Sequence, residues 1–242
     1  MPQPPLSTWS IGYETLDQLE QSKTPGSLYD LLVTSDEARS FAWTLAALTP
    51  WEYLPDDPPL RNGKVALPLA TQATREGLRA ANKLCDIVTA AHRHRPAIAA
   101  LKDAVCTGAD EARARDRVGM AIREWDARGG NWRLQALFAV LVDVEDKVAA
   151  VTKAGAIGRE GVLAEWQRFL DHLVEMDVMN APTMKRLVDG KLLMKELGAK
   201  PGRWTGPALE VALAWQLRNP GVEDPAGAVE EVRRRRVELG IS

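Results

Sequence analysis

The segment Lys200-Pro201-Gly202-Arg203 combines two cations with the two residue types that build tight turns. If Thr205 caps the helix that follows, the amide protons of the first helical turn lie beside Lys200 and Arg203 and can hold a phosphate group. Proline and glycine are also typical of a plain turn between two helices. Both interpretations can hold together, because a backbone that approaches a phosphate closely needs small residues for the same steric reason.

Alternating arginines provide a second set of candidate phosphate ligands. Arg113, Arg115 and Arg117 lie in a region expected to be helical, close to Glu111 and Asp116. Their positive charge suits contact with phosphates. The mixture of signs is equally typical of a solvated, salt-bridged helix face, so the sequence leaves the two interpretations equal.

The densest positive run is Arg233-Arg234-Arg235-Arg236. Contact of this run with phosphates would release counterions and make the affinity sensitive to salt. Glu230, Glu231 and Glu238 dilute its charge, and a basic run at this place is also typical of a solvated helix terminus.

A fourth basic group, His92-Arg93-His94-Arg95, is expected at a helix end, where cations favour the negative end of the helix macrodipole. A metal site and a phosphate contact are the alternatives. The phosphate contact stays compatible with a helix end, because cationic side chains at an exposed terminus remain accessible to a ligand.

The remaining titratable residues predict no catalytic or metal centre. Asp143 and Glu145 stand two apart in an expected helix, where their side chains point to nearly opposite sides and cannot share one ion. Cys85 and Cys106 lack the spacing of metal ligands, and we interpret them as reduced thiols of the core. His172 has no neighbouring nucleophile or ligand in the sequence.

The elements that carry these residues are expected to be helices. Apolar residues recur at intervals of three and four along almost the whole chain, whereas alternating β-branched runs are scarce. This predicts an all-α protein, an array of amphipathic helices that form a body and a smaller C-terminal tail without a substantial sheet. The main apolar stripes are Leu134 to Val151, Ala73 to Ala91, Leu163 to Leu173 and Leu209 to Leu217.

Caps, breaks and large aromatic residues refine this expectation. Asn131 is expected to cap the helix that begins near Leu134. Pro96 is expected to interrupt the helix before it, because proline lacks an amide proton and crowds the preceding turn. The tryptophans that fall within helical patterns are expected in the core rather than as base-stacking platforms; they are Trp125, Trp132, Trp166 and Trp215.

Turn-forming residues divide the chain into three segments. They lie at Pro55 to Gly63 and around Asn180-Ala181-Pro182. We expect a helical N-terminal segment over residues 1–60, a helical body over 61–178 and a helical tail over 179–242.

Composition limits the function further. The 242 residues carry 31 Lys+Arg and 33 Asp+Glu, so the net charge of −2 gives no overall attraction to a polyanion, and any nucleic-acid face must be local. Hydrophobic residues make up 45%, which is typical of globular proteins, and no apolar run has the length needed to span a bilayer. We expect an intracellular protein, with mitochondrial, nuclear and cytosolic locations not distinguished.

Three segments near the end of the chain resemble a known family. Val188 to Gly198, Lys200 to Gly206 and Trp215 to Pro220 follow one another as in the tail of class II tRNA nucleotidyltransferases, the CCA-adding enzymes of the poly(A) polymerase-like group, and the last segment is typical of fungal members. The segment Arg117 to Arg123 is similar to the body of the same family. Leu45 to Pro50 is similar to the start of the eukaryotic body.

The motifs of the family's catalytic head are not found in this sequence. The head binds a nucleoside triphosphate with a Gly-Ser-rich turn and holds magnesium with an Asp-x-Asp pair. The nucleotide-templating motif Glu-Asp-x-x-Arg is matched only by Asp36 to Arg39, with Ser35 in place of the acidic residue, so that role is not carried over. The resemblance implies a truncated chain or one half of a divided enzyme, with residues 1–60 continuing from a missing neck. It also implies that magnesium and CTP or ATP bind only in the head.

The function implied by the resemblance is that of a module that binds tRNA by its shape and presents the 3′ end to a catalytic head, as a domain or a separate subunit, with a homodimer as a further expectation. Double-helical RNA hides its base edges, so the contacts would be to phosphates and sugars. The expected RNA-binding residues are Lys195, Lys200, Arg203, Trp204, Arg113, Arg117, Arg233 and Arg234.

Two alternatives stay open. The near-neutral charge favours a helical scaffold or dimerisation domain with little RNA binding of its own. A complete enzyme with an unfamiliar site would require titratable groups that converge in a pocket. Clustering of the basic residues would favour RNA binding, and scattering among acids would favour the scaffold.

Overall fold

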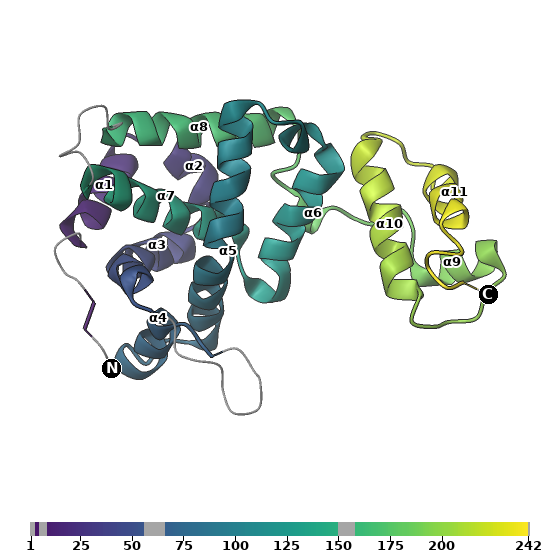
Figure 1. Ribbon diagram of the computed structural model, residues 1–242, viewed down its shortest axis with the longest axis horizontal. Coiled ribbons are helices and arrows are strands. Elements are labelled where there is room, and N and C mark those ends of the chain that lie inside the picture. The colour runs from purple at the N-terminus through teal and green to yellow at the C-terminus, as the bar shows by residue number, and fades with distance from the viewer. Residues whose placement is uncertain (1–2, 5–8, 56–65, 150–157, 242) are drawn as a thin grey trace. The chain divides into compact units, whose positions relative to one another are not determined.

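A computed structural model describes residues 3–4, 9–55, 66–149 and 158–241, and all regular secondary structure in these ranges is helical (Figure 1). The predicted all-α fold is therefore confirmed. The chain forms two compact units, each of which draws on two stretches of sequence. Unit 1 consists of residues 1–109 and 124–175, and unit 2 consists of residues 110–123 and 176–242. The three segments expected from the sequence stay a prediction.

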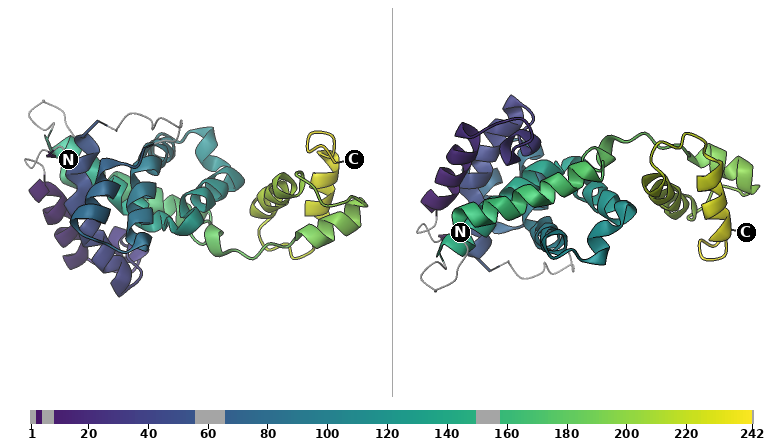
Figure 2. Two further views of the ribbon diagram at one scale, coloured as in Figure 1. Left: turned by 90° about the horizontal axis from the view of Figure 1, so that it is seen from below. Right: turned by 90° about the horizontal axis from the view of Figure 1, so that it is seen from above.

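Unit 1 is built around helix α7, Trp132–Ala149, which contacts helices α1, α2, α3, α5 and α8 (Figures 1 and 2). The elements of this unit are α1 (Trp9–Gln21), α2 (Leu28–Leu32), α3 (Asp36–Leu48), a 3₁₀ turn (Thr49–Tyr53), α4 (Leu69–Gln72), a π-helical turn (Ala73–Gly77), α5 (Asn82–Thr107), a 3₁₀ turn (Ala127–Gly129), α7 and α8 (Arg159–Glu175).

The central position of α7 follows from its sequence. Residues 134–142 are all buried, because this helix is apolar around most of its circumference. The Asn131 side chain accepts a hydrogen bond from the amide of Leu134 at 3.3 Å, which confirms the predicted cap. Val151, the last residue of the predicted stripe, lies outside the described residues, as do residues 56–63 of the predicted loop.

Helix α5 corrects one prediction. It runs from Asn82 to Thr107 without a break at Pro96. Proline removes one backbone hydrogen bond, but α5 packs along α7 and α8, and this tertiary packing stabilises the helix across the defect. The predicted helix end at His92 to Arg95 was therefore wrong, since these residues lie in the middle of α5.

The start of α5 also differs from the prediction. The apolar stripe from Ala73 to Ala91 spans two elements, since Ala73 opens the π-helical turn and Ala81 precedes the first residue of α5. The intervals of three and four residues along this stripe therefore do not belong to one continuous helix.

Unit 2 contains a 3₁₀ turn (Asp110–Arg113), most of α6 (Arg115–Asp126), a second 3₁₀ turn (Ala181–Thr183), α9 (Gly190–Leu197), α10 (Thr205–Arg218) and α11 (Ala226–Arg234). Helices α9, α10 and α11 contact one another around a small core. Trp204, Leu193 and Val232 are among its buried members. A second apolar cluster joins α10 to Ala181 through Leu213 and Leu217, with Met120 of α6 packed against it.

No helix among the described residues combines the length and the apolar character needed to cross a membrane.

Candidate nucleic-acid interface

The turn between α9 and α10 is fixed by caps on both sides. The Asp189 side chain accepts a hydrogen bond from the amide of Leu192 at 2.8 Å and so caps the start of α9. Gly198 ends α9 in the left-handed conformation with φ of 62°, and its amide donates to the last carbonyls of the helix. The chain then reverses through Lys200 to Trp204.

Inside the turn, Trp204 donates its indole N–H to the carbonyl of Lys200 at 2.9 Å. A Cβ atom at Gly202 would lie 2.9 Å from Trp204 Cδ1, so only glycine fits against the ring. Trp204 is 8% exposed and belongs to the core of unit 2. The ring therefore supports the turn from inside, and contact of Trp204 with RNA stays a prediction.

The expected cap of α10 was wrong. Trp204 occupies the capping position and Thr205 is the first helical residue. The amide of Thr205 already donates to the carbonyl of Gly202 at 3.1 Å. Pro207 has no amide proton, so the helix start offers fewer donors to a phosphate than the sequence suggested. Phosphate binding here would depend on side chains.

Lys200 and Arg203 lie on an open depression of about 700 Å³ in unit 2. The backbone of residues 198–202 forms one wall, and Leu239 and Gly240 form another. Both cations are exposed, and within the described part of the chain no carboxylate lies within ion-pair distance of either. Lys195 on α9 is exposed in the same way.

The run from Arg233 to Arg236 is partly engaged. Arg233 bonds Glu230 at 2.6 Å and the carbonyl of Glu196 on α9 at 3.1 Å. Arg234 lies 3.8 Å from Glu231. The positive charge of this run is therefore shared with acids of the same helix.

The central arginines have three different environments. Arg113 pairs with Asp110 at 3.5 Å, and Arg117 is exposed. Arg115 pairs with Asp177 at 3.1 Å, which fits the salt-bridged interpretation, but it also makes backbone contacts that neither interpretation considered. Its guanidinium donates to the carbonyls of Met176 at 2.6 Å and Leu217, and so ties the start of α6 to the end of α10. Sequence reasoning missed this role, because the partners lie 61 and 102 residues away.

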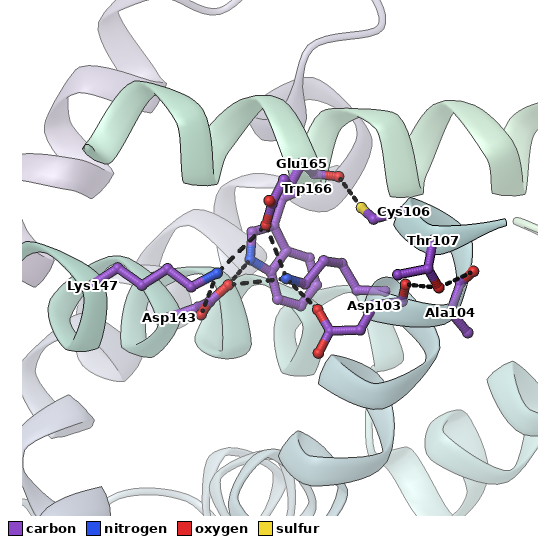
Figure 3. Close-up of polar contacts among 9 residues, drawn as sticks. Asp103, Ala104, Cys106, Thr107, Asp143, Lys147, Glu165 and Trp166 are labelled. Carbon is purple, nitrogen blue, oxygen red and sulfur yellow. Dashed lines mark hydrogen bonds and ion pairs between the residues drawn. The ribbon is translucent and has the colours of Figure 1, made fainter. Parts of the chain in front are cut away.

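Unit 1 holds a second polar cluster, around Lys102 of α5, whose partners Asp103, Asp143 and Glu165 are labelled in Figure 3. Its ammonium group lies 2.7 Å from Asp103, 3.4 Å from Asp143 and 3.2 Å from Glu165. Lys147 reaches Asp143 and Glu165 from the other side, at 3.4 Å each.

This cluster is structural in character. Burial lowers the pKa of Lys102, but hydrogen bonds and charges of Asp103, Asp143 and Glu165 outweigh that effect and hold the pKa above its ordinary value. An ammonium group held in its charged form is a poor nucleophile or base. We assign the cluster to the cohesion of α5, α7 and α8.

The helical argument about Asp143 and Glu145 is confirmed. Asp143 accepts from the indole of Trp166 at 2.9 Å, whereas Glu145 bonds Thr49 and Tyr53 on another side of α7. Among the described residues, no group of three or more His, Cys, Asp or Glu side chains could hold a metal ion.

Comparison with known proteins finds that the chain is similar to parts of nucleotidyltransferases. It is 45% identical to nucleotidyltransferase lcsQ of Purpureocillium lilacinum in an alignment that covers 98% of this chain and 45% of that protein. It is 28% identical to tRNA nucleotidyltransferase cca2 of Schizosaccharomyces pombe over 34% of this chain and 17% of the relative.

A third relative is the mitochondrial CCA tRNA nucleotidyltransferase of Saccharomyces cerevisiae, 28% identical over 44% of this chain and 18% of the relative. The resemblance inferred from the sequence is thus confirmed. The chain spans less than half of the length of the first of these relatives. No family model and no solved structure matches it.

Proposed function

We propose that this chain is the tRNA-holding part of a CCA-adding nucleotidyltransferase, which positions the acceptor end of tRNA for a catalytic head. The observation that carries the proposal is the depression at the turn between α9 and α10. Two exposed cations without carboxylate partners among the described residues, Lys200 and Arg203, lie there beside closely approachable backbone. The same segment carries the resemblance to the tail of CCA-adding enzymes.

The two cations have complementary chemistry. The guanidinium of Arg203 can hold two phosphate oxygens at once, and the ammonium of Lys200 acts as a mobile point charge. Such contacts fix the position of a duplex without reading its sequence, as expected for a module that accepts every tRNA.

The chemical step would belong to the part of the protein that this chain does not cover. Magnesium and CTP or ATP would bind in that catalytic head, on the same chain or on a separate subunit. The chain described here would contribute binding energy and orientation, which lower the barrier by keeping the reacting end in place.

The alternative function is a helical scaffold or a dimerisation domain. It is favoured by one specific observation, the pairing of arginines with acids in unit 2. Arg218 bonds both Asp116 at 2.7 Å and Glu231 at 3.3 Å, and Arg235 bonds Glu231 at 2.9 Å. The two pairs of Arg218 join α10 to α6 and to α11, and all three pairs leave less positive charge for RNA.

A titration of tRNA into the full chain at several salt concentrations separates the two functions, with a nucleotide-incorporation assay run beside it. We expect affinity to fall steeply with salt, because counterions are released on binding, and we expect no incorporation of CTP or ATP. Absence of tRNA binding at low salt, with self-association in sedimentation analysis, would favour the scaffold. Incorporation by this chain alone would contradict the division of labour.

Paired variants locate the binding surface. The double variant Lys200→Gln with Arg203→Gln is expected to lose about tenfold or more in affinity and to reduce the salt slope by about two, because each phosphate contact contributes about one to that slope. Arg186→Gln is the matched control, since Arg186 is a surface arginine of the same unit that pairs with Glu210 at 2.8 Å. An equal loss in the control would remove the assignment to the turn.

A further inference from the structure

A second, smaller pocket lies in unit 1. Its volume is about 150 Å³. It is bordered by the 3₁₀ turn Thr49–Tyr53, the start of α4 and the middle of α5. The lining residues are Trp51, Glu52, Leu54, Pro68, Leu69, His92 and Arg93.

Two of the lining side chains carry buried polar atoms without a hydrogen-bond partner. These atoms are the indole nitrogen of Trp51 and Nε2 of His92. His92 is only 9% exposed at its side chain, and its ring packs on Phe138 at a centroid distance of 4.7 Å. A buried polar group without a partner is destabilising, so two of them at one pocket indicate a polar ligand that satisfies both.

The orientation of the His92 ring is fixed from behind. Nδ1 lies 2.6 Å from one carboxylate oxygen of Glu52, and the other oxygen accepts from Arg95 at 2.6 Å. Since a carboxylate only accepts, Nδ1 must carry a hydrogen, and Nε2 is left to interact with the pocket. Both oxygens of Glu52 are engaged in this way and are not needed by a ligand.

The charges around the pocket favour an anion. Burial raises the pKa of Glu52, but the hydrogen bonds and charges of His92 and Arg95 lower it to a greater extent, so Glu52 is ionised and balances Arg95. Arg93, at the rim, is exposed, and no carboxylate of the described residues lies within ion-pair distance of it.

We propose that this pocket binds a phosphate-type oxyanion, held by the indole N–H of Trp51, Nε2 of His92 and the guanidinium of Arg93. Donors on two separate elements suit an acceptor with several oxygens. The pocket corresponds to about five times the ~30 Å³ that a water molecule occupies in the liquid, which suits a phosphate group. The group could come from free phosphate or from a nucleic-acid backbone.

Other ligands fit less well. An apolar molecule would leave both nitrogens without partners. A divalent cation would face Arg93 and would find the carboxylate of Glu52 already occupied. An oxyanion accepts from the indole N–H of Trp51 and from the guanidinium of Arg93, and it accepts from Nε2 of His92 when that nitrogen carries a hydrogen.

The direct test is an NMR titration of the ¹⁵N-labelled full chain with inorganic phosphate and, in a second arm, with a short oligoribonucleotide. The indole N–H signal of Trp51, assigned with Trp51→Phe, is expected to shift and saturate. Saturation by phosphate alone identifies a free anion as the ligand, and saturation only by the oligoribonucleotide identifies a backbone phosphate. No shift in either arm would overturn the proposal, and this wild-type result does not depend on any variant folding.

Variants confirm the donors. Trp51→Phe and His92→Asn are each expected to weaken binding about tenfold. The matched controls are Trp43→Phe and His94→Asn. The Trp43 indole already donates to Glu20 at 3.3 Å, and the ring of His94, which lies on the same helix as His92, bonds Gln135 at 2.8 Å. Equal weakening in the controls would contradict the site. These variants leave Lys200 and Arg203 intact, so tRNA can still bind at the turn if the pocket binds no oxyanion. Likewise, the pocket can bind an oxyanion even if the turn binds no tRNA.

Discussion

The Lys102 side chain is only 2% exposed, and its ammonium group contacts three carboxylates. One of them belongs to α5 itself, and the other two belong to α7 and α8. Removal of a buried charge partner leaves the opposite charges desolvated without compensation, which costs more than the pair itself contributes. The stability of the cluster therefore depends on the presence of all its charged members.

The first prediction concerns the charge of Lys102 in this cluster. Lys102→Met keeps the length of the side chain but removes its charge, and we expect a loss of about 3 kcal/mol in the free energy of unfolding measured with urea. Lys147→Met is the matched control, because Lys147 contacts two of the same carboxylates but is 34% exposed, where pairs contribute about 1 kcal/mol or less. A larger loss in the control would reverse the assignment.

Glu52 yields a prediction about pH. Its pKa lies below the ordinary value of 4.5. The stabilisation is therefore complete above about pH 4.5 and is lost as the pH falls through the lower folded-state pKa. Glu52→Gln should destabilise the chain by about 1–3 kcal/mol at neutral pH and much less in acid, where wild-type Glu52 is neutral too.

The measurement is urea unfolding of both proteins across that pH range. Glu37→Gln is the control, since Glu37 pairs with Lys83 on the surface with more than half of each side chain exposed. A gap between wild type and Glu52→Gln that stays constant from neutral pH into acid would contradict the linkage.

Among the elements, the contact between α10 and α11 depends on the absence of a side chain. A Cβ atom at Gly227 would lie 2.2 Å from the ring of Trp215, so α11 can approach α10 only with glycine at this position. The packing of the whole tail core rests on that approach, since both helices contribute to it.

We expect Gly227→Ala to destabilise the chain by about 1–3 kcal/mol through overpacking, as measured by circular dichroism during urea unfolding. Gly206→Ala is the matched control. A Cβ there meets nothing within 4 Å, and a helical Gly→Ala change of this kind is neutral or stabilises by about 0.4–1 kcal/mol. Equal effects of the two substitutions would show that the contact with Trp215 is not limiting.

Helix existence could be predicted from sequence because it depends on local periodicity. The stripe that begins at Leu134 gave α7, and Asn131 gave its cap. The effect of Pro96 could not be predicted from the neighbouring residues alone, because the continuation of α5 depends on its packing against α7 and α8. The cap expected at Thr205 failed because the helix begins one residue earlier than expected, with Trp204 at the capping position.

At the scale of the whole molecule, the pairing of individual charges matters more than the net charge. A net charge of −2 describes a chain in which many cations are neutralised by specific acids, while Lys200 and Arg203 have no carboxylate partner among the described residues. The candidate residues of the turn were recognised from their types. The pairing of Glu52 with His92 and the hydrogen bond of Arg115 to Leu217 could not be predicted from the sequence. Each joins residues at least 40 positions apart.

Unit 2 recruits residues 110–123 from the middle of the sequence, and this has a consequence for dissection of the protein. A cut near residue 178 would separate α10 from the helix on which Gly119 accommodates Leu217, and would leave the carbonyl of Leu217 without the guanidinium of Arg115. The last stretch of the chain is thus not an autonomous cassette. Gene fusions, deletions or domain exchanges that keep the tail functional must carry α6 with it.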